Sequence, residues 1–193
     1  MLRSLDAVLG LKIHAFFGYI KTLRYGYRDT DGRIHVMNVS DDYGGEKERF
    51  PYAFSSPEEV VKDNCGWCWD VANLILVYCR FHRLDCKSYF MEYRTETFHQ
   101  THTQVFVRYD HLWYEAPDNS SPATFGSVGF PDLRECVQAF VGPFVSYLKS
   151  VLQENYAEEN FLLREFSCEI GRGISNDEYL ALVRGEKETE QKS

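Results

Sequence analysis

Cys68 is the residue of this sequence best placed to act as a nucleophile. It follows Trp67 and precedes an apolar stretch, Val71–Cys79, in which only Asn73 and Tyr78 carry polar side chains. A helix that is apolar nearly all round is buried on most sides. A thiol in the first turn of such a helix is stabilised as the thiolate, the form that attacks carbonyl carbon.

A base for this thiol can come from the segment that follows the helix. His102 begins a predicted strand at 102–108, and the chain returns through a second strand at 112–115. An acid on that return, Glu115 or Asp118, would hold the imidazole in the required tautomer. These residues together form a candidate Cys-His-acid triad.

The register of the two strands decides between the acids. If the turn is Tyr109-Asp110, Gln104 faces Glu115, and Glu115 is a diagonal neighbour of His102 at roughly 7 Å. If the turn is one residue longer, Asp118 faces His102 and Glu115 turns away. We take Glu115 as the acid and Asp118 as the alternative.

Three motifs, in this order, resemble the transglutaminase-like superfamily of papain-type thiol enzymes, and most closely its small bacterial members. They are CGWCWDVANL, THTQVFV and LWYEAPDN, and the similarity covers roughly residues 20–145. The resemblance implies Cys68 as nucleophile and His102 as base, and its Trp-aromatic-Glu motif favours Glu115. It implies amide hydrolysis, deamidation or transamidation on a protein or peptide substrate, such as a glutamine side chain, without a cofactor.

The oxyanion donor departs from the papain-type pattern, because no Gln precedes position 100. The backbone N–H of Cys68 would supply one donor, and Asn64 is the nearest candidate for another. Trp67 and Trp69 flank the nucleophile and would either line the substrate cleft or belong to the core. His99 is the rival to His102 as the base.

Two other classes of function stay open. Cys65 and Cys68 form a C-x-x-C motif at a helix start, the pattern of thiol–disulfide oxidoreductases. The chain could also be a binding module that keeps the cleft without activity, with Cys68 as an inert buried thiol. No second ligand pair accompanies the motif, so no metal site is expected.

The charge and composition of the chain disfavour some classes of partner. The 193 residues carry a formal net charge of −8, which disfavours nucleic acid and anionic membrane surfaces as partners. No run of about 18 apolar residues would span a bilayer. The six cysteines, without a secretion signal, indicate free thiols in a reducing cytoplasm. The oligomeric state does not follow from the sequence.

The element order predicts an α+β, papain-type fold, with an antiparallel sheet packed on a central buried helix and flanking helices. A single domain is expected over 1–184, with a disordered charged tail at 185–193. Helices are expected at 1–25, from Pro57 to about Asp63, from Cys68 to about His82, at 131–150, 151–166 and 175–183; strands are expected in a hairpin at 25–40 and at 87–93, 102–108 and 112–115.

Overall fold

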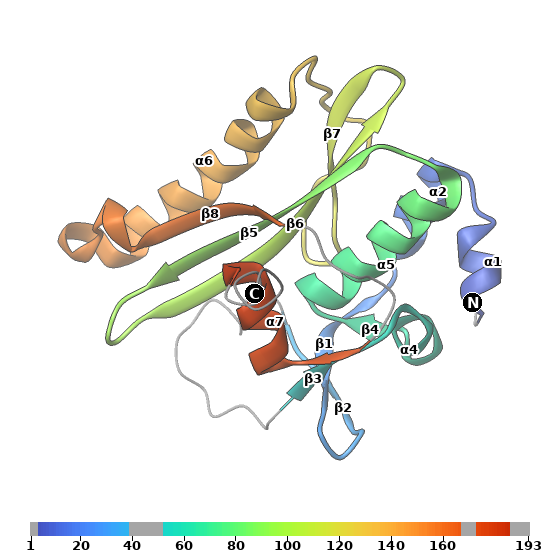
Figure 1. Ribbon diagram of the computed structural model, residues 1–193, viewed down its shortest axis with the longest axis horizontal. Coiled ribbons are helices and arrows are strands. Elements are labelled where there is room, and N and C mark those ends of the chain that lie inside the picture. The colour runs from blue at the N-terminus through green and yellow to red at the C-terminus, as the bar shows by residue number, and fades with distance from the viewer. Residues whose placement is uncertain (1–3, 39–51, 167–172, 186–193) are drawn as a thin grey trace, which may run out of the picture.

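The structure, a computed structural model, describes residues 4–38, 52–166 and 173–185. Six α-helices and two β-sheets make up these parts of the chain (Figure 1), which is compatible with the predicted α+β class. The helices are α1 (Leu5–Leu9), α2 (Ile13–Ile20), α4 (Pro57–Asp63), α5 (Cys68–His82), α6 (Leu133–Leu152) and α7 (Asn176–Arg184). The strands are β1 (Arg24–Asp29), β2 (Ile34–Val36), β3 (Tyr52–Phe54), β4 (Cys65–Gly66), β5 (Cys86–Arg94), β6 (His99–Tyr109), β7 (Leu112–Ala116), β8 (Phe161–Phe166) and β9 (Ile174–Ser175).

One sheet has four strands in the order β7-β6-β5-β8 and is antiparallel throughout. Its strands are the longer ones, so we call it the larger sheet, although the other sheet has five strands. Because side chains alternate along a strand, β6 presents different residues to its two faces. Phe106 packs with Val137 and Phe140 of α6, whereas Val105 and Val107 belong to the core around α5. The sheet therefore lies between α6 on one face and α5 on the other (Figure 1).

Helix α5 is the buried helix that the apolar stretch predicted. Its residues from Trp69 to Leu76 are all buried. Helix α2 packs against it, with the rings of Phe16 and Tyr78 stacked at 3.7 Å between centroids. Cys68 therefore stands at the start of a helix that runs through the core.

The smaller sheet joins distant parts of the chain. Its order is β2-β1-β3-β9, and β4 pairs with β1 in parallel. The β1–β2 hairpin was predicted, and its turn is stabilised by Asp29, whose Oδ1 accepts the backbone N–H groups of Asp31 and Arg33. Pairing of Ala53 with Ser175 brings the C-terminal helix α7 next to β3.

Three predicted helices are corrected. The described part of the predicted helix at 1–25 forms two short helices with a break at Gly10, and strand β1 begins at Arg24. Helix α6 runs from Leu133 to Leu152 rather than over 131–150, and it continues through Pro143. The predicted helix at 151–166 is wrong, because its second half pairs with the edge of β5 as strand β8. Of the predicted tail, only Gly185 lies within the described residues.

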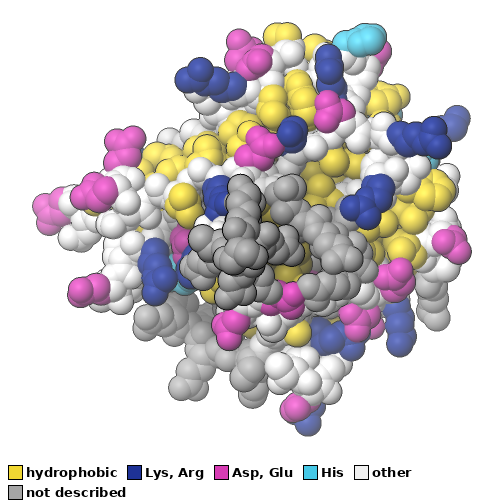
Figure 2. Space-filling view, viewed as in Figure 1, with side chains coloured by type: hydrophobic (Ala, Val, Ile, Leu, Met, Phe, Trp, Pro, Cys, Tyr) yellow, Lys and Arg dark blue, Asp and Glu magenta, His cyan; other side chains and the backbone are white. Residues whose placement is uncertain are grey.

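Charged side chains of both signs are mixed on the surface. On the face shown in Figure 2, Lys and Arg side chains lie scattered among Asp and Glu rather than gathered in one patch. Within the described ranges, no helix combines the length and the apolar character needed to cross a membrane.

Candidate functional site

The first turn of α5 is fixed by Asp70. The backbone N–H of Trp67 donates to its Oδ2 at 3.0 Å, and the backbone N–H of Ser55 donates to its Oδ1 at 2.7 Å. Asp70 is fully buried, and burial raises its pKa to about 7 although the two hydrogen bonds act in the opposite direction. Asp70 thus caps the N-terminus of the helix, and this cap positions Cys68, the half-buried first residue of the helix.

The loop after β7 is held against the strand that leads to Cys68. Asn119 Nδ2 donates to the carbonyl oxygens of Arg24 and Gly66, each at 3.0 Å. Gly66 also leaves space for the cap, since a Cβ there would lie 2.9 Å from the Cβ of Asp70. These contacts bring the acids of the 115–121 segment to the same part of the molecule as the thiol.

His102 lies on β6 opposite Met91 of β5. Its ring stacks on Phe140 of α6, with centroids 5.8 Å apart and planes at 26°. Its Nε2 lies 3.3 Å from Oε1 of Gln104, the next residue on the same face of the strand. The imidazole is therefore held by an aromatic face and by a side-chain amide.

The predicted registers of β6 and β7 are both wrong by at least one residue. The ladder pairs Phe106 with Glu115, and the two-residue turn is Asp110-His111, with φ of 49° and 68°. Asp and His enter this left-handed region more readily than most residues other than Gly, and the conformation suits a tight hairpin. Glu115 therefore lies opposite a position four residues from His102, about 13 Å along the strand, and is not its diagonal neighbour.

The two acids lie close to each other and are linked through a serine. Ser121 donates its backbone N–H to Asp118 Oδ1 at 2.7 Å and its hydroxyl to Glu115 Oε1 at 3.3 Å. Ser120 adds backbone and hydroxyl bonds to the same Asp118 oxygen, both at 2.8 Å. Burial raises the pKa of Glu115, and the negative charge of Asp118 adds to this shift.

Asp118 is the more buried acid, with 4% of its surface exposed. Its Oδ2 is buried and has no hydrogen-bond partner among the described residues. Within the described residues, the hydrogen bonds of the two carboxylates join them to serines, and neither reaches His102.

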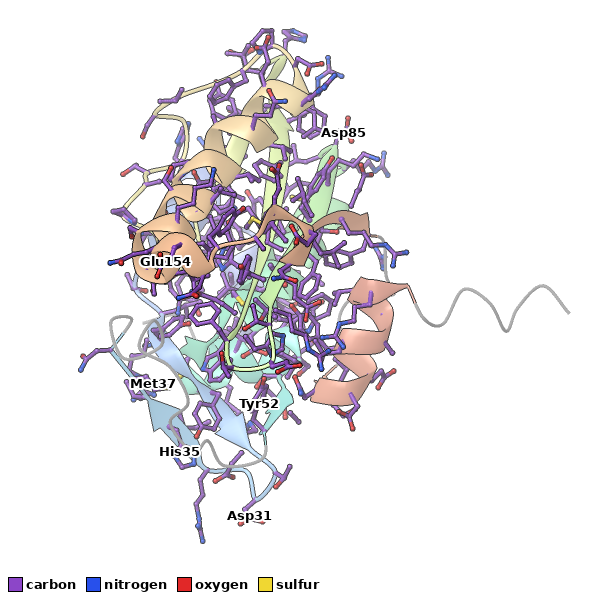
Figure 3. The ribbon with its side chains drawn as sticks, turned by 90° about the vertical axis from the view of Figure 1, so that its left-hand side faces the viewer. Asp31, His35, Met37, Tyr52, Asp85 and Glu154 are labelled. Atoms are coloured by element: carbon purple, nitrogen blue, oxygen red, sulfur yellow. The ribbon has the colours of Figure 1, made fainter. Side chains whose placement is uncertain are left out.

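A cavity of about 830 Å³ joins these residues. It is lined by Cys68, His102, Glu115 and Asp118, and its remaining lining is largely aromatic and polar without charge. The small sheet and the segment before α5 supply Tyr25, Tyr52, Phe54 and Trp67, and α6 supplies Ala139, Phe140, Pro143, Phe144 and Tyr147. Tyr52, labelled in Figure 3, belongs to strand β3 of the small sheet, and its ring packs on that of Trp67 with 4.7 Å between centroids.

Trp69, for which cleft and core were both open, and Asn64, the candidate oxyanion donor, do not line this cavity. Trp69 is 1% exposed and packs on Phe166 and Tyr179 in the core. Asn64 ends α4 in a left-handed conformation with φ of 52°, and its carbonyl oxygen accepts the backbone N–H of Arg24. Trp67 and His99, in contrast, are both in the lining.

Helix α7 contributes residues that sequence reasoning missed. Asn176, Tyr179 and Leu180 line the cavity. The hydroxyl of Tyr179 lies 2.5 Å from that of Thr103 on β6, and its pKa is raised by burial and by the nearby Cys68. The sequence predicted a helix at 175–183 but not its neighbours, because these are set by the long-range pairing of β3 with β9. Gln104 was also missed, although its spacing of two from His102 marks the same strand face.

Cys65 differs from Cys68 in its surroundings. It is 4% exposed, and burial raises the pKa of its thiol to about 11. All cysteines in the described ranges are thiols rather than disulfides. The same ranges hold no group of three or more His, Cys, Asp or Glu side chains arranged to bind a metal ion.

No family model and no curated protein matches this sequence. The residues around the cavity are therefore the guide to the function of this chain.

Proposed function

We propose that this chain is a cysteine-dependent acyl-transfer enzyme that acts on carboxamides of a protein or peptide, in the manner of transglutaminase-like, papain-type enzymes. Cys68 is the nucleophile and His102 is the base. The observation that carries the proposal is that one cavity is lined by the first residue of α5, by an oriented imidazole and by two carboxylates.

The reaction begins with transfer of the Cys68 proton to His102. The thiolate forms a C–S bond with the substrate carbonyl carbon, and the N-terminal end of α5 stabilises the negative oxygen that develops. Collapse of this intermediate breaks the C–N bond, and His102 returns the proton to the leaving ammonia or amine. Water or a second amine then attacks the thioester, which yields a carboxylic acid or a new amide and restores the thiol.

The charge of the lining supports a neutral or cationic substrate. No Lys or Arg is among the described residues that line the cavity, whereas Glu115 and Asp118 are. A carboxamide is neutral, and a second-substrate amine is cationic until it loses its proton. The aromatic lining, with Trp67 next to the thiol, would exclude bulk water from the reacting atoms.

The C-x-x-C alternative gains less support. An oxidoreductase needs Cys65 to exchange with Cys68 as a thiolate, and the buried Cys65 with its raised pKa is poorly suited to that step. We also propose a cytoplasmic location, because a reducing compartment would keep the nucleophilic thiol in its reduced form.

Site-selective alkylation tests the proposed pair. The protein is treated with one equivalent of iodoacetamide near neutral pH, and the adduct is mapped by peptide mass spectrometry. Preferential labelling of Cys68 is expected, with loss of this preference in His102→Ala and its retention in His14→Ala, which removes an exposed histidine of α2. Labelling spread evenly over the thiols, or unchanged in His102→Ala, would contradict the assignment.

A product assay separates the reactions and tests for activity. A glutamine-containing peptide is incubated with the protein, with and without an excess of a primary amine, and ammonia, cleaved peptide and amine adduct are measured. Ammonia alone indicates deamidation, a shortened peptide indicates hydrolysis, and an adduct indicates transamidation. Selective labelling of Cys68 together with none of these products, across a peptide library, would favour the non-catalytic binding module.

A further inference from the structure

Gln104 makes three hydrogen bonds from a buried position on β6, where 3% of its surface is exposed. Its Nε2 donates to the carbonyl oxygen of Val105 at 3.0 Å and to that of Ala116 at 2.7 Å. Its Oε1 faces Nε2 of His102 at 3.3 Å. The amide thus connects the imidazole to the end of β7.

These bonds determine which end of the amide faces His102. An amide nitrogen donates two hydrogen bonds and an amide oxygen only accepts. A flipped amide would set its oxygen against two carbonyl oxygens, acceptor against acceptor. Both N–H groups of Gln104 are therefore taken by Val105 and Ala116, and its oxygen is the atom that meets the imidazole.

The orientation of Gln104 fixes the proton on the imidazole. Since Oε1 cannot donate, His102 Nε2 must carry the hydrogen of this bond, and the neutral ring then has its lone pair on Nδ1. Stacking on Phe140 restrains the ring plane. The nitrogen that can accept a proton from Cys68 is therefore Nδ1.

We infer that Gln104 is the positioning residue of His102, in the place that the sequence analysis gave to an acid; this rests on the proposed roles of Cys68 and His102. The hydrogen bonds of Glu115 and Asp118 go to Ser120 and Ser121, so the carboxylates have other partners. A neutral amide sets the tautomer as a carboxylate would, but it adds no negative charge to stabilise the imidazolium. The acids are thereby left to contact the substrate.

Nitrogen NMR of the wild-type protein tests the tautomer without any substitution. Long-range ¹H–¹⁵N correlation spectra of uniformly labelled protein distinguish the Nε2–H, Nδ1–H and doubly protonated rings, and the His102 signals are identified by their absence in His102→Gln. The expected result at a pH where the ring is neutral is Nε2–H. An Nδ1–H ring in the wild-type protein would overturn the inference.

Two substitutions test whether the amide oxygen is the cause. Gln104→Met removes the acceptor, so a mixture of tautomers and about tenfold slower alkylation of Cys68 near neutral pH are expected. Gln104→Glu keeps an acceptor toward His102 but replaces the amide donor, so the new carboxyl must hold a proton to meet the carbonyl oxygens of Val105 and Ala116. The Nε2–H ring is expected while it holds that proton, and the low-pH limb of the alkylation profile changes. Gln138→Met, on the exposed side of α6, controls for the exchange of Gln for Met. If Met and Glu at 104 give the same tautomer and the same pH profile, the amide acts only as structure and the inference fails.

The two proposals fail in different ways. An Nε2–H ring that depends on Gln104, together with a Cys68 that is alkylated like any other thiol, would refute the thiol enzyme and leave the hydrogen-bond assignment in place. A selectively reactive Cys68 with an unchanged His102 ring in Gln104→Met would refute the positioning role and leave the enzyme.

Discussion

The side-chain amide of Asn119 donates to the carbonyl oxygen of Gly66 at 3.0 Å. Gly66 lies two residues before Cys68, and Asn119 follows Asp118, so one side chain ties the acidic segment to the approach of the thiol. A second bond from the same nitrogen to the carbonyl oxygen of Arg24 extends this link to β1.

Asn119→Ala removes both bonds and leaves two carbonyl groups without this donor. We expect the free energy of unfolding to fall by about 1–2 kcal/mol, and the selectivity for Cys68 over the other thiols to decrease. Urea unfolding and adduct mapping measure the two effects. Asn155→Ala, at an exposed position after α6, is the matched control, and equal losses in both variants would show that the link has no special role.

We expect the free energy of unfolding to depend on pH through the carboxyl group of Asp70. Its pKa is raised from the ordinary value to about 7, chiefly by burial, so between about pH 4 and pH 7 the folded state binds a proton that the unfolded chain has lost. The contribution of this carboxyl to the free energy of unfolding therefore decreases as the pH rises through that window, by up to about 4 kcal/mol. In Asp70→Asn this slope should disappear, and the difference in urea stability between the two proteins should change steadily with pH. Parallel stability curves would contradict the shifted pKa.

Some elements of the site could be predicted from the sequence and others could not. Cys68 and its buried helix were predictable, because the apolar run that follows the thiol is a local signal. His102 was predictable as a strand residue, because the β-branched and apolar residues that follow it are also a local signal. The register of β6 and β7 was not, because Asp110 and His111 adopt a left-handed turn without the Gly or Asn that usually marks one.

Contacts between distant segments account for the other differences. No local sequence pattern in Phe161–Phe166 predicts that this segment pairs with β5. Its Leu, Arg and Glu residues are good helix formers. The role of α7 depends in the same way on the pairing of β3 with β9. The hydrogen bond between Gln104 and His102 depends on the end of β7, which fixes the amide.

We expect Glu115 to lower the stability of the fold at neutral pH while it supports the activity. Its pKa is raised by burial and by the charge of Asp118, so the ionised form destabilises the folded state at neutral pH. Glu115→Gln should raise the free energy of unfolding by about 0.5–1 kcal/mol at pH 7 while it lowers the turnover of the peptide substrate. The gain should shrink as the pH falls and Glu115 becomes protonated. Glu154→Gln, at the exposed position labelled in Figure 3, should change neither quantity; a loss of stability at 115 would contradict the account.

Helix α7 is fastened to the large sheet by Glu92. Arg184 Nε donates to Glu92 Oε2 at 3.1 Å, and His99 Nε2 lies 2.7 Å from Oε1. Burial alone would raise the pKa of Glu92, but these hydrogen bonds outweigh it and the pKa is lowered. The stabilisation is therefore present above the ordinary pKa of a glutamate and is lost as the pH falls through the lowered value.

Arg184→Met should loosen α7 and expose the part of the cavity that Tyr179 and Leu180 line. Hydrogen exchange of the amides of α7, corrected for the intrinsic pH dependence, should accelerate by about tenfold. Arg134→Met, at an exposed position of α6, should leave α7 unaffected. Equal protection of α7 in the wild-type protein and in Arg184→Met would show that the ion pair does not hold the helix.

The alkylation rate of Cys68 as a function of pH tests the central claim most directly, because it needs no knowledge of the substrate. An ordinary thiol ionises near pH 8.5, whereas a thiolate paired with His102 at the start of α5 reacts at about pH 6. We predict a rate that is already substantial at that pH in the wild-type protein and in His14→Ala, and that loses this low-pH component in His102→Gln. A single titration near the ordinary value, the same in all three proteins, would contradict the assignment of Cys68 and His102 as a catalytic pair.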